Sequence, residues 1–188
     1  MKKCSLLALI ALSLNVVTAN AVTVAKSTNP QLDKYLGKWY EIARLPDRHE
    51  KSCNPPIVSE YRINSLNNQQ LVINNKCKNK NGHAQLKTTV ADFSNDYEIL
   101  RLKVYFWPDF LKWLPFAYDS NRLYPLDNQQ VVIVGSENHQ HLWILARREN
   151  INMDVLEDAI NRAQKNGYVT HKLIFNYRLS YYSRNPKN

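Results

Sequence analysis

Apolar and polar residues alternate with a period of two in eight short segments, a pattern typical of half-buried β-strands. The segments span residues 38–45, 57–64, 71–78, 84–93, 99–107, 121–127, 130–137 and 141–149. The linkers between them are short and polar, for example SLNNQQ at 65–70 and SNDY at 94–97. We therefore expect strands that follow one another in the sequence to pair antiparallel through hairpins.

Helical periodicity follows the eighth segment. One apolar stripe runs through residues 152–167 and consists of Val155, Leu156, Ala159, Ile160 and Ala163. Asn152 is a candidate N-cap, and Gly167 is placed for the C′ position that follows the helix. A short ninth strand is predicted at 172–179, and residues 30–37 are predicted to form a single turn before the first strand.

This order of elements predicts an all-β fold. We expect an eight-stranded up-and-down antiparallel barrel, with one C-terminal α-helix packed on its wall and a short ninth strand. Closure removes the exposed edges that an open eight-stranded sheet would carry. A barrel of eight strands encloses an interior just large enough for one small ligand.

The start of the chain resembles a secretory signal. Lys2 and Lys3 precede an apolar stretch that is too short to span a bilayer, and Ala19-Asn20-Ala21 supplies a small-x-small cleavage site. We expect a signal peptide at 1–21, an N-terminal extension at 22–30, the barrel domain at 31–180 and a tail at 181–188. A buried N-terminal helix is the alternative. Cys4 precedes the apolar stretch, so the sequence does not predict a lipoprotein.

The predicted cleavage leaves a basic chain of single-domain size. Removing 21 residues from 188 leaves 167, and losing two lysines lowers the formal charge from +9 to +7. Basic charge is compatible with nucleic acid, an anionic membrane surface, an acidic ligand or plain solubility. The charges are scattered and the chain is predicted to be exported, so we expect no nucleic-acid partner. We expect an exported protein, located in the periplasm if the source is a Gram-negative bacterium, with association with the outer membrane left open.

Cys53 and Cys77 are the two cysteines that remain after the predicted cleavage. Two cysteines in an exported chain suggest one disulfide, and two free buried thiols are the alternative. There is no Cys-x-x-Cys motif with matching His spacing, so we expect no metal site. His139 and His141 share a strand face, but they belong to a polar turn, where we expect a solvated hairpin tip.

The sequence offers little support for a catalytic function. The sequence contains no Gly-x-Ser-x-Gly motif and no glycine-rich loop that would hold a phosphate. We therefore expect a protein that is not an enzyme and needs no cofactor.

Two motifs carry a family resemblance. Gly37-Lys38-Trp39 lies in the stretch GKWYEIAR, and LWILARR at 142–148 contains Arg147 near its end. This pair of motifs, at this separation, resembles the lipocalins, and most of all the bacterial outer-membrane lipocalins of the Blc type and their apolipoprotein D-like relatives. The resemblance implies a barrel that binds a fatty acid or a lysophospholipid, as a monomer or a homodimer.

The barrel topology assigns roles to the motif residues. Trp39 begins the first strand and Arg147 ends the eighth, which runs antiparallel to it, so the two meet at one rim. There the guanidinium can stack on the indole, and Gly37 lets the preceding turn cross beneath it. This contact is predicted to be structural. Cys53 and Cys77 are expected together at the opposite, open mouth.

Strand parity predicts the cavity lining if charged residues point outward. Trp143 is expected in the lining because it shares the parity of Arg147 on the eighth strand. The other ligand-binding residues, expected from the outward position of the charges, are Tyr61, Leu102, Val104 and Phe106. The same rule turns Leu86, Thr88 and Val90 of the fourth strand inward and leaves Arg44 among the exposed cations near the mouth. The resulting lining is apolar with a few hydroxyls, as suits an acyl chain; a filled barrel is the alternative.

An aromatic loop at 107–118 lies at the predicted mouth. Its rings are Trp107, Phe110, Trp113, Phe116 and Tyr118. The loop can act as a lid or a membrane-touching tip, or its rings can fold into the mouth as core. We predict a carrier of a hydrophobic ligand for lipid transport, storage or membrane maintenance. The alternatives are an interaction protein that docks a membrane or a partner through this loop, and an enzyme that acts on a bound lipid.

Overall fold

The computed structural model describes residues 30–46, 53–94, 100–105, 118–127 and 130–176. Eight strands lie in the segments where alternation predicted them. They are β1 (Gly37–Arg44), β2 (Asn54–Asn64), β3 (Asn67–Lys78), β4 (Ala84–Phe93), β5 (Leu100–Tyr105), β6 (Tyr118–Leu126), β7 (Val131–Ser136) and β8 (Leu142–Ala146). The remaining elements are α1 (Pro30–Asp33), α2 (Met153–Lys165), the 3-10 helix η4 (Thr170–Lys172) and β9 (Ile174–Phe175).

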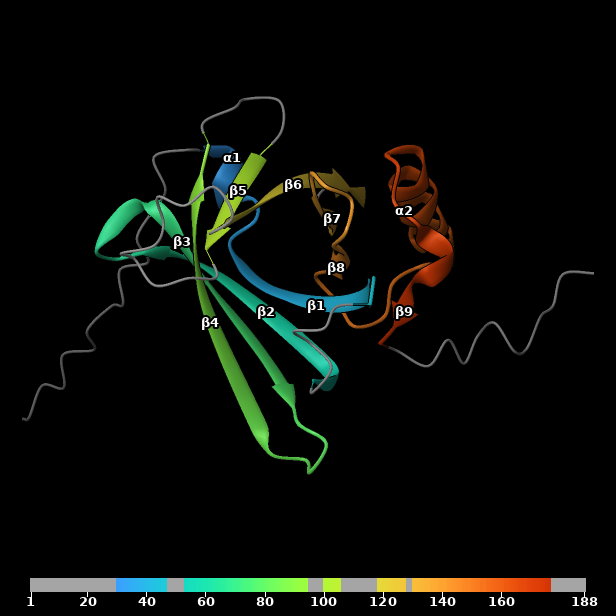
Figure 1. Ribbon diagram of the computed structural model, residues 1–188, viewed down its shortest axis with the longest axis horizontal. Helices are drawn as coiled ribbons and strands as arrows, with labels where there is room; N and C mark the ends of the chain where they lie inside the picture. The colour runs from blue at the N-terminus through green and yellow to red at the C-terminus, as the bar shows by residue number, and fades with distance from the viewer. Residues whose placement is uncertain (1–29, 47–52, 95–99, 106–117, 128–129, 177–188) are drawn as a thin grey trace, which may run out of the picture.

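The strands form a closed antiparallel barrel (Figure 1). Each strand pairs with the next from β2 to β8, β8 pairs with β1, and β1 pairs with β2 to complete the circle. β2 pairs with β1 only over Gly37–Tyr40, and the short β9 pairs with Ala43 and Arg44 beyond that point. The predicted eight-stranded up-and-down barrel with one helix and a ninth strand is confirmed.

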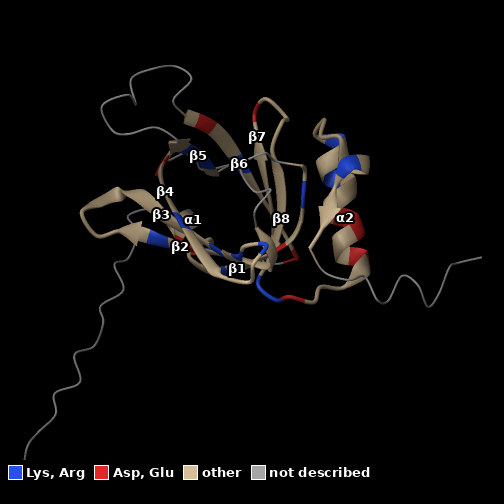
Figure 2. Cartoon of the chain, turned by 60° about the horizontal axis from the view of Figure 1, so that its bottom comes forward, with Lys and Arg blue, Asp and Glu red and all other residues tan. Residues whose placement is uncertain are grey.

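Helix α2 packs on the outside of the barrel, as predicted. Its buried residues Leu156, Ala159 and Ala163 belong to a hydrophobic cluster with outward-facing side chains of β1, β7 and β8. The Asn152 side chain accepts a hydrogen bond from the backbone N–H of Asp154, which makes it the N-cap. Figure 2 shows acidic residues toward the start of α2 and basic residues toward its end, the arrangement that the helix dipole favours.

A second hydrophobic cluster lies inside the barrel and extends to the end where β1 begins. It includes the fully buried residues Trp39, Leu71, Leu102 and Leu123. The segment before β1 closes this end, because the side chains of Leu32 and Tyr35 are buried against the same cluster. Gly37 has a φ of +92°, a backbone conformation that side-chain-bearing residues rarely adopt, so a glycine suits the entry into β1.

A disulfide joins Cys53 to Cys77, which confirms the pairing predicted for these cysteines. It connects the residue before β2 to the C-terminal end of β3, with the two Cα atoms 5.5 Å apart. No helix within the described part of the chain is long and apolar enough to cross a membrane.

An irregularity in β1 changes which side chains face inward. Its register against β8 shifts between Glu41 and Ala43. Beyond the shift, Ala43 packs in the cluster under α2, whereas Arg44 pairs with the cavity-lining Trp143. Both charged residues of this strand segment, Glu41 and Arg44, are therefore buried.

A candidate ligand-binding cavity inside the barrel

A cavity of about 130 Å³ lies inside the barrel, and the apolar residues of its lining belong to the cluster that contains Trp39 or pack against it. On the same measure a single water needs only ~10–15 Å³, so the space is sufficient for part of an organic ligand. The lining consists of Glu41, Ser59, Tyr61, Ile73, Asn75, Lys87, Thr89, Leu102, Val104, Asn121, Val134, His141, Trp143 and Leu145. Half of these are apolar or aromatic, and half carry amide, hydroxyl, imidazole or charged groups, so the cavity is more polar than the sequence analysis expected.

Trp39 and Arg147 close one end of the barrel, which we call the floor. The guanidinium carbon of Arg147 lies 3.6 Å from the centroid of the Trp39 ring. The same guanidinium donates hydrogen bonds to the backbone oxygens of Lys34, at 2.7 Å, and Lys38, at 3.0 Å. The Trp39 indole N–H donates to the Tyr35 carbonyl at 2.7 Å. Arg147 thus ties the segment before β1 across this end of the barrel, and its partial burial lowers the pKa of the guanidinium.

The structure brings four of the five predicted ligand-binding residues together around the cavity. Tyr61 and Leu102 are buried in its wall, and Val104 and Trp143 are half-buried. Phe106 lies outside the described residues. Burial, and secondarily the negative charge of Glu41, raises the pKa of the Tyr61 hydroxyl, so the group stays neutral and protonated at physiological pH.

Of the five aromatic residues assigned to the mouth loop, only Tyr118 is described. Trp107, Phe110, Trp113 and Phe116 fall in the segment 106–117, outside the described residues. Tyr118 opens strand β6, where it pairs with Tyr105 of β5. The two rings are tilted, with centroids 6.0 Å apart, and the Lys103 ammonium lies 5.3 Å from the Tyr118 ring.

The parity predicted for β4 is wrong. Leu86 is 61% exposed, and the hydroxyl of Thr88 donates to the Asn74 side chain on the outer wall. Lys87 and Thr89 line the cavity instead. The register with β3 decides this outcome, because cross-strand partners point to the same side of a sheet. Lys87 pairs with Asn75 and Thr89 pairs with Ile73, two cavity-lining residues.

The assumption that charged residues point outward therefore fails at Lys87. A lysine can line a cavity with its methylene stem while its ammonium remains in water. The Lys87 side chain fits this description, since it lines the cavity and is nevertheless exposed.

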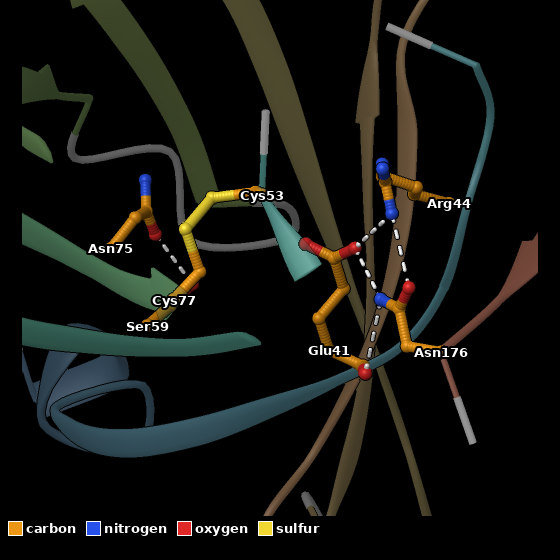
Figure 3. A network of polar contacts seen from close by, with 7 residues as sticks. All are labelled: Glu41, Arg44, Cys53, Ser59, Asn75, Cys77 and Asn176. Carbon is orange, nitrogen blue, oxygen red and sulfur yellow. Dashed lines mark hydrogen bonds and ion pairs between the residues drawn. A yellow bond between two sulfur atoms is a disulfide. The ribbon is translucent and has the colours of Figure 1, made fainter. Parts of the chain in front are cut away.

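Glu41 is the functional candidate that sequence reasoning missed. Its side chain lines the cavity and is only 2% exposed. Arg44 donates to Glu41 Oε1 at 3.1 Å and to Asn176 Oδ1 at 3.0 Å, and the Asn176 amide donates to the same carboxylate (Figure 3). A signal was available, because inward-facing Trp39 places the residue two positions later on the same side of the strand.

Arg44 is consequently not an exposed cation at the mouth, as the sequence analysis had expected. Its guanidinium is buried and engaged with the Glu41 carboxylate and the Asn176 amide. The three side chains form a polar network in the barrel wall where β2 has left β1 and β9 has taken up pairing with it. The Glu41 carboxylate is therefore paired with a cation inside the barrel wall.

His141 also departs from its predicted place at a solvated hairpin tip. Its ring lines the cavity and stacks on Trp143, with centroids 5.9 Å apart and planes 14° apart. Its Nε2 lies 3.9 Å from Asp119 Oδ2. His139 does occupy the turn, with its ring edge against Tyr168. In the described ranges, no three His, Cys, Asp or Glu side chains gather in a way that could hold a metal ion.

Asn121 places an amide group in the cavity wall from β6. Its side chain is only 4% exposed, and no described group lies within hydrogen-bonding distance of its Oδ1. By contrast, the Asn75 oxygen accepts a hydrogen bond of 2.6 Å from the Ser59 hydroxyl. The polar groups of the cavity thus differ in whether a described group of the protein forms a hydrogen bond with them.

Positive charge is concentrated beside the open end. The β3–β4 hairpin extends beyond the rest of the barrel (Figure 1). The sequence contains no acidic residue between Glu60 and Asp92. Exposed lysines on this hairpin are Lys76, Lys78, Lys80 and Lys87. The mouth is therefore cationic on this side, in contrast to the carboxylate held deeper at Glu41.

The fold and the cavity agree with the comparisons with known proteins. A family model described as a lipocalin-like domain matches residues 31–178. This chain belongs to the lipocalin family.

Two relatives match the groups that the sequence motifs indicated. The chain is 29% identical to the outer membrane lipoprotein Blc of Vibrio cholerae over 147 residues, which cover 77% of this chain and 81% of that protein. It is 32% identical to apolipoprotein D of Bos taurus over 123 residues, covering 63% and 61% respectively. The resemblance to Blc-type and apolipoprotein D-like lipocalins is confirmed.

A solved structure shares the architecture. Lobster apocrustacyanin A1 is 14% identical to this chain and superimposes with a TM-score of 0.56, with 78% of each chain covered. At this identity the likeness shows the fold alone.

Proposed function

We propose that this lipocalin binds an amphipathic lipid, a fatty acid or a lysophospholipid, in its barrel cavity. The observation that carries the proposal is a cavity closed at one end by the Trp39–Arg147 contact and lined by a lysine, Lys87, toward the other. Membership of a family that binds small hydrophobic ligands supports it. The role that follows is lipid transport, storage or membrane maintenance.

The distribution of charge favours one orientation of the ligand. An anionic head group is best placed near Lys87 and the basic hairpin, because these lysines attract it, whereas Arg44 is already paired with the Glu41 carboxylate. The acyl chain then extends into the barrel toward Trp39. Each buried CH₂ contributes about 0.8 kcal/mol, so about a dozen of them give roughly 10 kcal/mol before the costs of ordering the ligand. Micromolar affinity is therefore expected.

The proposed contacts with the acyl chain are those that the sequence analysis named. Tyr61, Leu102, Val104 and Trp143 would surround it, and Phe106 would add to them. Leu102 offers the clearest test, since it is almost fully buried in the cavity wall. A larger side chain there would take up space that the ligand needs.

The proposal is tested by displacing a dansyl-labelled fatty acid from the purified protein with unlabelled stearic acid. We expect saturable binding in the micromolar range and at least tenfold weaker binding to Leu102→Trp. Leu86→Trp is the matched control, because it makes the same change on the exposed outer face of β4 and should bind as wild type does. Circular dichroism checks that both variants fold. No saturable binding to the wild-type protein at tens of micromolar would overturn the proposal.

We further propose that the protein is exported through the predicted signal peptide at 1–21, that it acts in the periplasm with or without peripheral contact to the outer membrane, and that it is not an enzyme. A monomer or a homodimer is compatible with this role. If the mouth loop 107–118 instead docks a membrane, the protein should sediment with lipid vesicles while showing no displacement of the dansyl probe.

A further inference from the structure

Asn121 places a buried amide oxygen without a hydrogen-bonding partner in the cavity wall, among the residues that the structure describes. Its side chain is buried from solvent, and its Oδ1 has no hydrogen-bonding partner in the described part of the chain. Buried polar atoms in proteins are almost always paired, and leaving an acceptor unpaired is costly. An amide kept in this position therefore points to a partner that the protein does not supply.

The neighbouring side chains cannot provide that partner. Asn121 pairs across the sheet with Leu102 on β5 and with Ser136 on β7. Leu102 has no polar atom in its side chain. The Ser136 hydroxyl lies 2.6 Å from the Asn138 side chain and accepts the backbone N–H of His141 at 2.9 Å. The hydrogen-bonding capacity next to Asn121 is thus already used at the β7–β8 turn.

The unpaired atom restricts the chemistry of the missing partner. Asn121 Oδ1 is an acceptor, so its partner must donate a hydrogen bond, which an ionised carboxylate or phosphate oxygen cannot do. A hydroxyl can donate to the amide oxygen, and it can equally accept from the amide nitrogen if the two ends are exchanged.

We propose that the cavity selects a lipid whose buried chain carries a hydroxyl group, which Asn121 binds. This inference rests on the proposed function and specifies its ligand. A site built to hydrogen-bond a hydroxyl discriminates against the analogue that lacks it, because the buried amide is then left unpaired. The expected preference over the plain acyl chain is roughly tenfold, the lower part of the range for one unmet hydrogen bond.

The experiment compares matched ligands on the intact protein. Stearic acid and a panel of hydroxystearic acids, which differ only in the position of the hydroxyl, compete with the dansyl-labelled fatty acid. At least one member of the panel should displace the probe at a concentration about tenfold lower than stearic acid does. Asn121→Leu should remove this preference, so that no hydroxystearic acid displaces the probe at a lower concentration than stearic acid does. Asn74→Leu makes the same change on the outer wall, where Asn74 bonds to Thr88, and should keep the preference.

The outcomes separate this inference from the proposed function. If stearic acid binds but no hydroxystearic acid binds more tightly, the hydroxyl preference is wrong while lipid binding stands. A preference that persists in Asn121→Leu would assign it to another residue and overturn the role of Asn121. The comparison of ligands on the wild-type protein needs no variant, so it is decisive even if Asn121→Leu does not fold. Failure of every ligand to displace the probe would overturn the proposed function, and this inference with it.

Discussion

Arg147 stacks on Trp39 with its guanidinium carbon 3.6 Å from the ring centroid, although the two residues lie near opposite ends of the barrel sequence. The contact arises because β1 and β8 are antiparallel neighbours, so the start of one and the end of the other share a rim. Two further hydrogen bonds, to the carbonyls of Lys34 and Lys38, fix the segment that crosses this rim. The contact therefore joins three parts of the chain and closes one end of the cavity.

Replacing Trp39 by alanine should lower the free energy of unfolding by about 3–5 kcal/mol, as large truncations in a core do. The side chain is fully buried, and its loss also removes the surface on which Arg147 stacks. Urea denaturation followed by circular dichroism measures the change. An unchanged midpoint would contradict the structural role given to this residue.

Arg147→Lys should destabilise less, by about 1–2 kcal/mol. Lysine keeps the positive charge, but it lacks the planar surface and the fork of donors that reaches both carbonyls. The neighbouring Arg148 is exposed, so Arg148→Lys serves as the control and should unfold at the wild-type urea concentration.

Removing the disulfide should lower stability by about 3 kcal/mol in the chain-entropy account. Cys53 and Cys77 are separated by 24 residues, so their link restricts a loop of moderate length in the unfolded chain. The double variant Cys53→Ser/Cys77→Ser and the reduced wild-type protein should unfold at similar urea concentrations. If dithiothreitol shifts the midpoint of the double variant as well, the effect of the reductant does not come from this disulfide.

Arg44→Met should destabilise the protein by about 3 kcal/mol at neutral pH, because it removes a positive charge from beside the buried Glu41 carboxylate. Replacing both members, as Glu41→Leu/Arg44→Met, should restore part of that stability by removing the buried charge as well. A double-mutant cycle in urea measures this coupling. Additive effects of the two substitutions would show that the pair does not act as a unit.

Stability should fall as the pH rises from about 10 to about 12. The pKa of Tyr168 and the pKa of Tyr105 are each raised to about 12, above the usual value near 10, and burial is the main cause in both. In this window the unfolded chain has released protons that the folded chain still holds, so raising the pH favours unfolding.

Tyr168 offers the test of this pH dependence, because its hydroxyl is buried and donates to the Ser136 carbonyl at 2.9 Å. A shift of two pKa units corresponds to a loss of about 2–3 kcal/mol across the window. Tyr168→Phe should be less stable than wild type at pH 8 and should lose less stability between pH 10 and 12. Urea midpoints at a series of pH values measure both effects; equal slopes for the two proteins would contradict the assignment.

The barrel and its closed end could be predicted from the sequence because both follow from local information. Alternation marked each strand, short polar linkers gave the antiparallel order, and the order alone brought Trp39 and Arg147 to one rim. The cavity walls could be predicted only in part. Tyr61 and Leu102 lie on strands where one face is clearly more apolar, and Trp143 shares the parity of Arg147, so all three were placed correctly around the cavity.

β4 shows why parity fails elsewhere. Its two faces are almost equally mixed, one carrying Leu86 and Thr88 and the other Lys87 and Thr89. Neither face is clearly more apolar, and the preference for exposing lysine then selects the wrong one. The pairing of Lys87 with Asn75 fixes the true orientation, and that pairing is a property of the assembled sheet.

The sequence by itself determined the strand order, the disulfide partners and the residues that close the floor. The strand order follows from the periodicity of apolar residues, the shared rim of Trp39 and Arg147 follows from the strand directions, and the disulfide follows from the presence of two cysteines after the predicted cleavage. Only the tertiary structure decided where the polar groups of the cavity face. Glu41 is buried because Arg44, across a local irregularity of β1, and Asn176, far along the chain, bond to its carboxylate. In the described part of the chain no group bonds to Asn121 Oδ1, and the hydroxyl of its cross-strand neighbour Ser136 is engaged at the β7–β8 turn. Burial of a polar group depends on partners that only folding brings together.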